Sequence, residues 1–66
     1  MKVGTKVKTS LGEVFVLEIQ ERYLILFNPV KGEFIRANNY KLNNNKVSWG
    51  GGEYYFTLKE LIENYS

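Results

Sequence analysis

The sequence predicts a mainly β domain (β-rich α+β), in which a small antiparallel barrel or curled sheet of five or six strands is followed by one C-terminal α-helix. Three observations lead to this class. Short segments of alternating apolar and polar residues recur between turn-forming residues, as in strands joined by hairpins. Apolar residues at helical spacing occur near the C-terminus. The chain has 66 residues, enough for one small core, so a single domain over residues 1–66 is expected.

The first two strands are expected to form a hairpin. Residues 3–9 alternate valine and threonine with glycine and lysine, which is the period of a half-buried strand. Residues 10–12 form a short turn, and residues 13–19 form the second strand. We interpret Lys6 and Lys8 as edge-strand lysines, which discourage the addition of further strands.

The third strand, within residues 22–28, is apolar on both faces, because tyrosine, isoleucine and phenylalanine alternate with two leucines. A small antiparallel sheet normally has one wetted face, so something must cover the second face of this strand. A turn that contains the proline leads to a fourth strand over residues 32–38. A last hairpin pairs residues 40–42 with residues 46–49 across an asparagine triplet, which tolerates left-handed backbone.

The expected cover for that face is a helix at about residues 57–65. Thr57 and Glu60 have the spacing of a capping box, in which each side chain accepts a hydrogen bond from an amide at the helix start. The glycines at residues 50–52 are expected to form a flexible crossing from the sheet to the helix. The apolar stripe of the helix would consist of Leu58, Leu61, Ile62 and Tyr65.

The residue inventory argues against several kinds of chemistry. The chain has no cysteine, histidine or aspartate, so it lacks the ligands of a structural zinc site or an EF-hand and the partners of a nucleophilic triad. We therefore expect no enzyme activity, no metal and no cofactor. The glycine run is not followed by the lysine of a phosphate-binding loop, and Glu53 places a negative charge beside it. A site for a small ligand at this glycine-rich junction is a third alternative, besides protein binding and nucleic-acid binding.

The candidate binding surface lies in the acid-free stretch between Glu33 and Glu53. Cations and aromatic side chains are interleaved there, and single-stranded nucleic-acid binders use that pairing for phosphates and bases. The structural alternative is that the aromatics belong to the core and the cations to a solvated edge, and the net charge of +2 is low for a nucleic-acid binder. The expected binding residues, for a protein partner or alternatively for nucleic acid, are Arg36, Tyr40, Lys41, Lys46, Trp49 and Tyr55.

Two resemblances add to this interpretation. Residues 3–19, VGTKVKTSLGEVFVLEI, resemble the opening hairpin of small SH3-like barrels, which implies that fold. Residues 40–62 resemble a pattern in small uncharacterised proteins of phages and conjugative elements, although the histidine and alanine of that pattern are missing here. The matching residues are Ser48, Trp49, Tyr55 and Phe56. This second resemblance implies an origin in a mobile element, so the predicted function is a non-catalytic protein-binding module, such as an accessory, inhibitor or anti-defence protein.

The chain is expected to be cytoplasmic and to self-associate. Its N-terminus has no apolar run of signal-peptide length, and the longest apolar stretch, YLILF, is too short to span a bilayer, so no membrane partner is expected. One short helix leaves part of the second face of the sheet uncovered, which predicts a homodimer. Trp49 is expected to be at least partly buried, because strand parity places it on the side of Val47.

Overall fold

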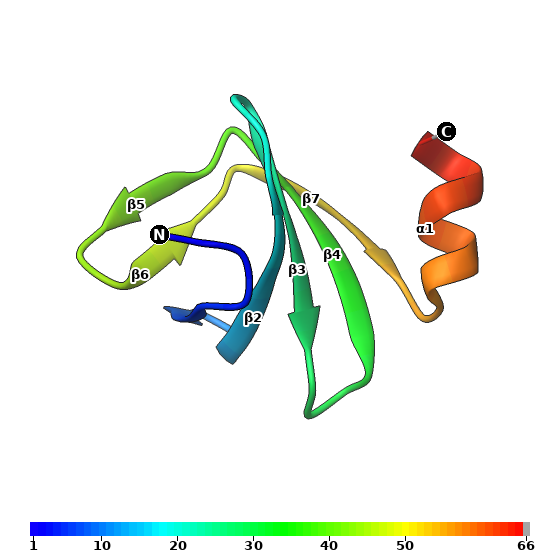
Figure 1. Ribbon diagram of the computed structural model, residues 1–66, viewed down its shortest axis with the longest axis horizontal. Coiled ribbons are helices and arrows are strands. Elements are labelled where there is room, and N and C mark those ends of the chain that lie inside the picture. Colours follow the sequence, from blue (N-terminus) through cyan, green and yellow to red (C-terminus); the bar gives the residue numbers. More distant parts are fainter. Residues whose placement is uncertain (66) are drawn as a thin grey trace.

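The computed structural model describes residues 1–65, the last of them in its backbone only, and shows a mainly β fold (Figure 1). Seven strands form one sheet, and a short helix follows at the C-terminal end. The mainly β class with a C-terminal helix is confirmed, but there are seven strands where five or six were expected. The strands are β1 Lys6–Thr9, β2 Gly12–Ile19, β3 Tyr23–Asn28, β4 Glu33–Asn38, β5 Lys41–Asn43, β6 Lys46–Ser48 and β7 Gly51–Tyr55, and the helix is α1 Leu58–Tyr65.

The sheet is strongly curled, because a very short link joins two strands that are distant in the strand order. The order is β5-β6-β1-β2-β3-β4-β7, yet only Trp49 and Gly50 connect β6 to β7. At a strand spacing of about 4.8 Å, a flat sheet would separate these two strands by about 24 Å. The three peptide steps from Ser48 to Gly51 span at most about 11 Å. The ends of the sheet must therefore approach each other, although the sheet is not closed into a barrel, since β5 and β7 remain its edges within the described residues.

The additional strand, β7, begins inside the glycine run. Gly51 and Gly52 were expected to form a flexible crossing, but they pair with β4 in an antiparallel register that also sets Glu53 opposite Arg36. Glycine is depleted in strands because it costs backbone entropy and offers no side chain to pack. Here the hydrogen bonds to β4 offset that cost, so the crossing is limited to the two residues before the strand.

The first strand is shorter and more central than expected. β1 begins at Lys6, because the segment before it turns at Gly4, which has a φ of 89°, and leaves Val3 64% exposed. β1 lies between β6 and β2, with which it pairs in parallel and antiparallel fashion respectively. The interpretation of Lys6 and Lys8 as edge-strand lysines is therefore wrong, since β5 and β7 form the edges.

The core lies on one face of the sheet, here called the inner face. Alternation along the strands sends one set of side chains to this face, as the sequence pattern predicted. No second layer formed by the described residues covers them, so the curled sheet itself encloses the core. Ile19, Tyr40 and Trp49 pack against its margin. The core residues, each 2% exposed or less, are Val7, Val14, Val16, Leu24, Leu26, Ile35, Ala37 and Val47.

Helix α1 begins as the capping box predicted, with one partner displaced. Thr57 Oγ1 accepts a hydrogen bond from the backbone N–H of Glu60 at 3.1 Å. Glu60 Oε2 accepts one from the N–H of Phe56 at 3.3 Å, whereas the expected donor was the N–H of Thr57. Both bonds satisfy amides at the start of the chain's helical segment, and they fix the direction in which α1 leaves β7.

The helix covers only a small part of the opposite, outer face. Leu61 is 6% exposed, but Leu58 and Ile62 are 51% and 55% exposed, so one residue of the predicted stripe is buried. The side chain of Tyr65, the fourth member of that stripe, lies outside the described part of the chain. Within the described residues, no helix is long and apolar enough to cross a membrane.

Candidate binding surfaces

The six residues predicted for binding lie on two different sides of the molecule. Arg36 and Tyr55 are half-buried on the outer face of the neighbouring strands β4 and β7. Tyr40 and Trp49 are half-buried at the margin of the inner-face core. The remaining two, Lys41 and Lys46, are exposed on the β5–β6 hairpin. The structure thus gathers four of the six around one end of the curled sheet and leaves two elsewhere.

Arg36 and Tyr55 take part in contacts within the protein. The guanidinium carbon of Arg36 lies 4.2 Å from the centroid of the Tyr23 ring on β3, a cation–π geometry. The strand register sets Arg36 opposite Glu53, and the hydroxyl of Tyr55 donates a hydrogen bond to Glu53 Oε2 at 2.7 Å. These contacts join β3, β4 and β7 across the outer face, so they are sufficient to explain both residues structurally.

The Trp49 ring lies close against the backbone of β7 at Gly52. An ideal Cβ on Gly52 would lie 2.6 Å from Nε1 and 3.1 Å from Cδ1 of the Trp49 ring, which is closer than real contacts permit. Only glycine at position 52 allows this approach. The ring also packs against the core margin, which confirms the expected partial burial of Trp49. These two contacts hold the half-buried ring beside β7.

Three hollows surround Trp49 and the β5–β6 hairpin. One of about 340 Å³ is lined by Trp49, Lys46 and Tyr54 together with Ser10, Val47, Ser48, Gly50 and Gly52. A second of about 340 Å³ is lined by Asn39, Lys41, Ser48, Trp49 and Gly50. A third of about 410 Å³ is lined by Lys8, Lys46 and the residues Asn43, Asn44 and Asn45. None of their lining residues is acidic, and we call this connected surface the Trp49 track.

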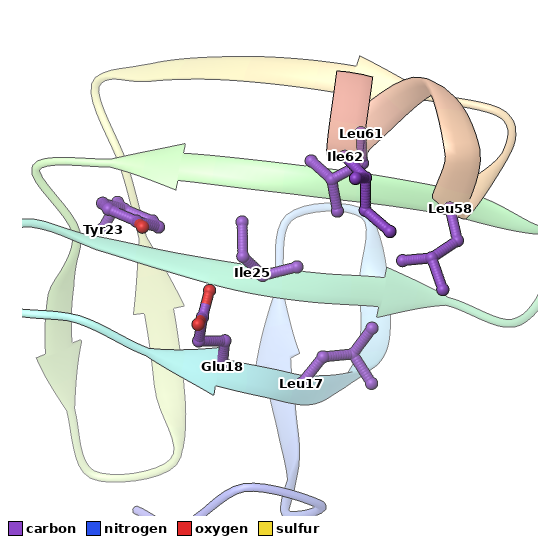
Figure 2. A pocket seen from close by; sticks show the side chains of 7 residues that line it. All are labelled: Leu17, Glu18, Tyr23, Ile25, Leu58, Leu61 and Ile62. Atoms are coloured by element: carbon purple, nitrogen blue, oxygen red, sulfur yellow. The ribbon is translucent and has the colours of Figure 1, made fainter. Parts of the chain in front are cut away.

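A separate groove of about 440 Å³ lies between α1 and the outer face of the sheet. Figure 2 shows the leucine and isoleucine side chains of the helix pointing toward β3, with two side chains of β2 alongside. The groove is mainly apolar, and Glu18 is its only charged lining residue. The lining residues are Leu17, Glu18, Tyr23, Ile25, Leu58, Leu61 and Ile62.

A β-bulge places Glu18 in this groove. The register between β2 and β3 shifts between Val16 and Glu18, so Leu17 and Glu18 both lie on the outer face. Strict alternation would send Glu18 to the core side, where an unpaired carboxylate is costly. Sequence reasoning missed this residue, because it assumed uninterrupted alternation in the second strand.

The groove and the Trp49 track are the two candidate binding surfaces of the described residues. Among the described residues, no group of three or more acidic side chains is arranged to hold a metal ion. Comparison of the chain with protein-family models, with curated proteins and with solved structures found no match. The groove offers apolar contacts beside one carboxylate. The track offers an aromatic ring for stacking and lysine side chains beside it.

Proposed function

We propose that the protein is a non-catalytic binding module that captures a segment of another protein in the groove between α1 and the outer face of β2 and β3. The observation that carries this proposal is the exposure of Leu58 and Ile62, which are 51% and 55% exposed although they belong to the apolar stripe of the helix. Together with Leu17 and Ile25 they border an open apolar hollow. A large apolar side chain from a partner would remove this surface from water.

Charge complementarity indicates the kind of segment that fits. Glu18 lines the groove, and it forms no ion pair with the residues that the structure describes. An ion pair within α1 joins Lys59 and Glu63 at 4.0 Å, on exposed side chains, and does not involve Glu18. The proposed occupant is therefore a peptide segment with a large apolar side chain next to a lysine or arginine, whose cation would face Glu18.

A peptide-display selection tests this function. Peptides are selected on the wild-type protein and counter-selected on Ile62→Ser, and the enriched peptides are then titrated by calorimetry. We expect an apolar–basic motif, binding that weakens at least fivefold in Ile62→Ser, and a preference that shifts from basic to acidic peptides in Glu18→Lys. Val30→Ser is the matched control, because Val30 is 88% exposed in the β3–β4 turn, away from the groove.

Two results would reject the groove as the site of protein capture. One is a selection that enriches no common motif. The other is a set of peptides whose affinity does not respond to Ile62→Ser or Glu18→Lys. Sedimentation of the free protein at high micromolar concentration identifies the other occupant: a homodimer that dissociates in Ile62→Ser would mean that a second copy fills the groove.

We also propose a more specific fold and a biological role. We propose that the curled, open sheet is a variant of the SH3-like fold, as the resemblance of residues 3–19 implies. Residues 40–62 carry the resemblance to proteins of phages and conjugative elements. The module would then act in the cytoplasm as an accessory or inhibitory protein of a mobile element, by occupying a surface of its protein partner.

A further inference from the structure

We propose that the Trp49 track is a second binding site, separate from the groove, in which a short single strand of nucleic acid stacks a base on Trp49 and places phosphates on Lys8, Lys41 and Lys46. The site goes beyond protein capture, because it uses the other end of the curled sheet and different chemistry. Four features of the track lead to a single strand as its ligand.

The three hollows share lining residues, which places them next to one another. Lys46 lines both the hollow of about 410 Å³ beside the asparagines and the hollow of about 340 Å³ beside Tyr54. Trp49 lines that second hollow and also the hollow that contains Lys41. A chain-like ligand can therefore run from Lys8 past Trp49 to Lys41 without leaving the surface. A compact ligand would fill only one of the hollows.

Trp49 presents an aromatic surface that is already oriented. Its ring lies on Gly52, where a Cβ would come within 2.6 Å of Nε1, and it packs against the core margin. Tyr54, which is 46% exposed, lines the same hollow. Stacking on a fixed aromatic side chain loses little conformational entropy and accepts any unpaired base. In a duplex the flat surfaces of the bases are covered by their neighbours, so the track favours single strands.

Two cations of the track, Lys8 and Lys46, are neighbours, and Lys46 has no ion-pair partner among the described residues. Lys8 and Lys46 are directly opposite each other across the β1–β6 pair, and like charges in this position repel. Glu13 lies opposite Lys8 on its other side, but the neighbour of Lys46 on β5 is Asn43. No described residue forms an ion pair with Lys46. A phosphate bound between the two lysines would relieve their repulsion.

The asparagines add hydrogen-bonding groups without adding charge. Asn43, Asn44 and Asn45 line the hollow with the two lysines, and Asn39 lines the hollow with Lys41. Each amide side chain offers both a donor and an acceptor, which suits base edges and sugar hydroxyls. An acidic peptide would use the lysines but would gain little from a stacking surface, so nucleic acid is the ligand that uses all parts of the track.

Titration of intrinsic fluorescence tests the site directly, because Trp49 is the only tryptophan. Oligothymidylate and oligouridylate of about ten nucleotides, a length within the usual range of small β-barrel sites, are the probes, and a duplex of equal length is the comparison. We expect both single strands to quench Trp49 and the duplex to bind at least tenfold more weakly. Three phosphate contacts predict a log–log salt slope of about −2, or roughly a 15-fold loss of affinity between 50 and 200 mM salt.

Two double variants that lose the same charge at different positions show which lysines contact the phosphates. Lys41→Ala with Lys46→Ala should reduce the salt slope by about 1.4, since each single-strand phosphate contact contributes about 0.7. Lys2→Ala with Lys31→Ala removes the same charge from exposed positions outside the track and should leave the slope unchanged. Measured by the anisotropy of a dye-labelled oligonucleotide, since these variants lack the only tryptophan, Trp49→Leu should weaken binding at least fivefold, whereas Trp49→Phe should retain most of it. Ile62→Ser, in the groove, should have no effect.

Several outcomes would overturn the proposal. They are the absence of quenching with either single strand, equal affinity for the duplex, and equal losses in the Lys41/Lys46 variant and its charge-matched control. The lysine variants change exposed side chains, so they remain informative if Trp49→Leu unfolds. A preference for one of the two single strands would support the site and identify DNA or RNA as the ligand.

Discussion

The inner and outer faces of this sheet bury apolar side chains in different ways. On the inner face, curling of the sheet leaves eight core residues 2% exposed or less without any helix. On the outer face, α1 buries Leu61 but leaves Leu58 and Ile62 about half-exposed. Side chains converge on the concave side of a curled sheet and diverge on its convex side, so the convex side needs a second layer. The fold is therefore expected to be stabilised mainly from the inside, and the outer face keeps exposed apolar surface.

The largest change in the free energy of unfolding is expected for a substitution in the core of the inner face. Leu26 is fully buried on β3, so Leu26→Ala should lower the free energy of unfolding by roughly 3–5 kcal/mol. That approaches the total stability expected for a chain of this size. Urea denaturation followed by circular dichroism provides the measurement. A loss smaller than about 1 kcal/mol would show that the inner face is not the main source of stability.

A smaller effect is expected where the helix meets the outer face. Leu61 is the one buried side chain of α1 among its described residues, and Leu61→Ala should cost roughly 2 kcal/mol, the low end for a buried leucine. Thermal melting measures the loss, with the half-exposed Leu58→Ala as the control. If both variants melt like the parent protein, α1 does not contribute to stability and the groove is not maintained by the fold.

A third variant tests the contact between Trp49 and β7. Gly52→Ala places a methyl group where the Trp49 ring now lies, and it should cost roughly 1 kcal/mol, because the half-buried ring can move outward. We expect a red shift of tryptophan fluorescence as the ring becomes wetter. Gly51→Ala is the matched control, since a Cβ there meets no atom within 4 Å. Identical spectra for the two variants would contradict the close approach.

The smallest effect on stability is expected in the groove itself. Ile62 is 55% exposed, so Ile62→Ala should change the free energy of unfolding by less than about 1 kcal/mol. Chemical denaturation checks this value. A larger loss would mean that Ile62 belongs to a core formed with the helix, and the groove would then be part of the stabilising structure. The same result would weaken the use of Ile62→Ser as a binding variant.

Much of the inner face was predictable, because local patterns determine it. Alternation in the third strand placed Leu24 and Leu26 on one face, and the spacing of Thr57 and Glu60 located the helix start. These signals depend only on residues close in sequence. The structure agrees with the strand signal because the third strand pairs with the strands next to it in the sequence.

The features missed by sequence analysis depend on contacts that are distant in sequence or on interrupted alternation. The pairing of Lys8 with Lys46 is parallel and non-local, so no local pattern indicates it. The bulge that turns Glu18 outward breaks the period on which the prediction relied. The glycines of β7 pair only because β4 is available to them. The area covered by α1 depends on the angle at which it leaves β7, which the sequence pattern does not specify.

The link formed by Trp49 and Gly50 also constrains the order in which the chain can fold. The hairpins β1–β2, β2–β3 and β3–β4 need only neighbouring segments, so they can form early. When β7 aligns with β4, the short link holds β6 close to the end of β7, so this pairing favours the docking of β6 on β1. The two non-local pairings are therefore expected to support each other in a late, cooperative step. The Trp49 track is assembled in that same event, so it exists only in the fully folded chain.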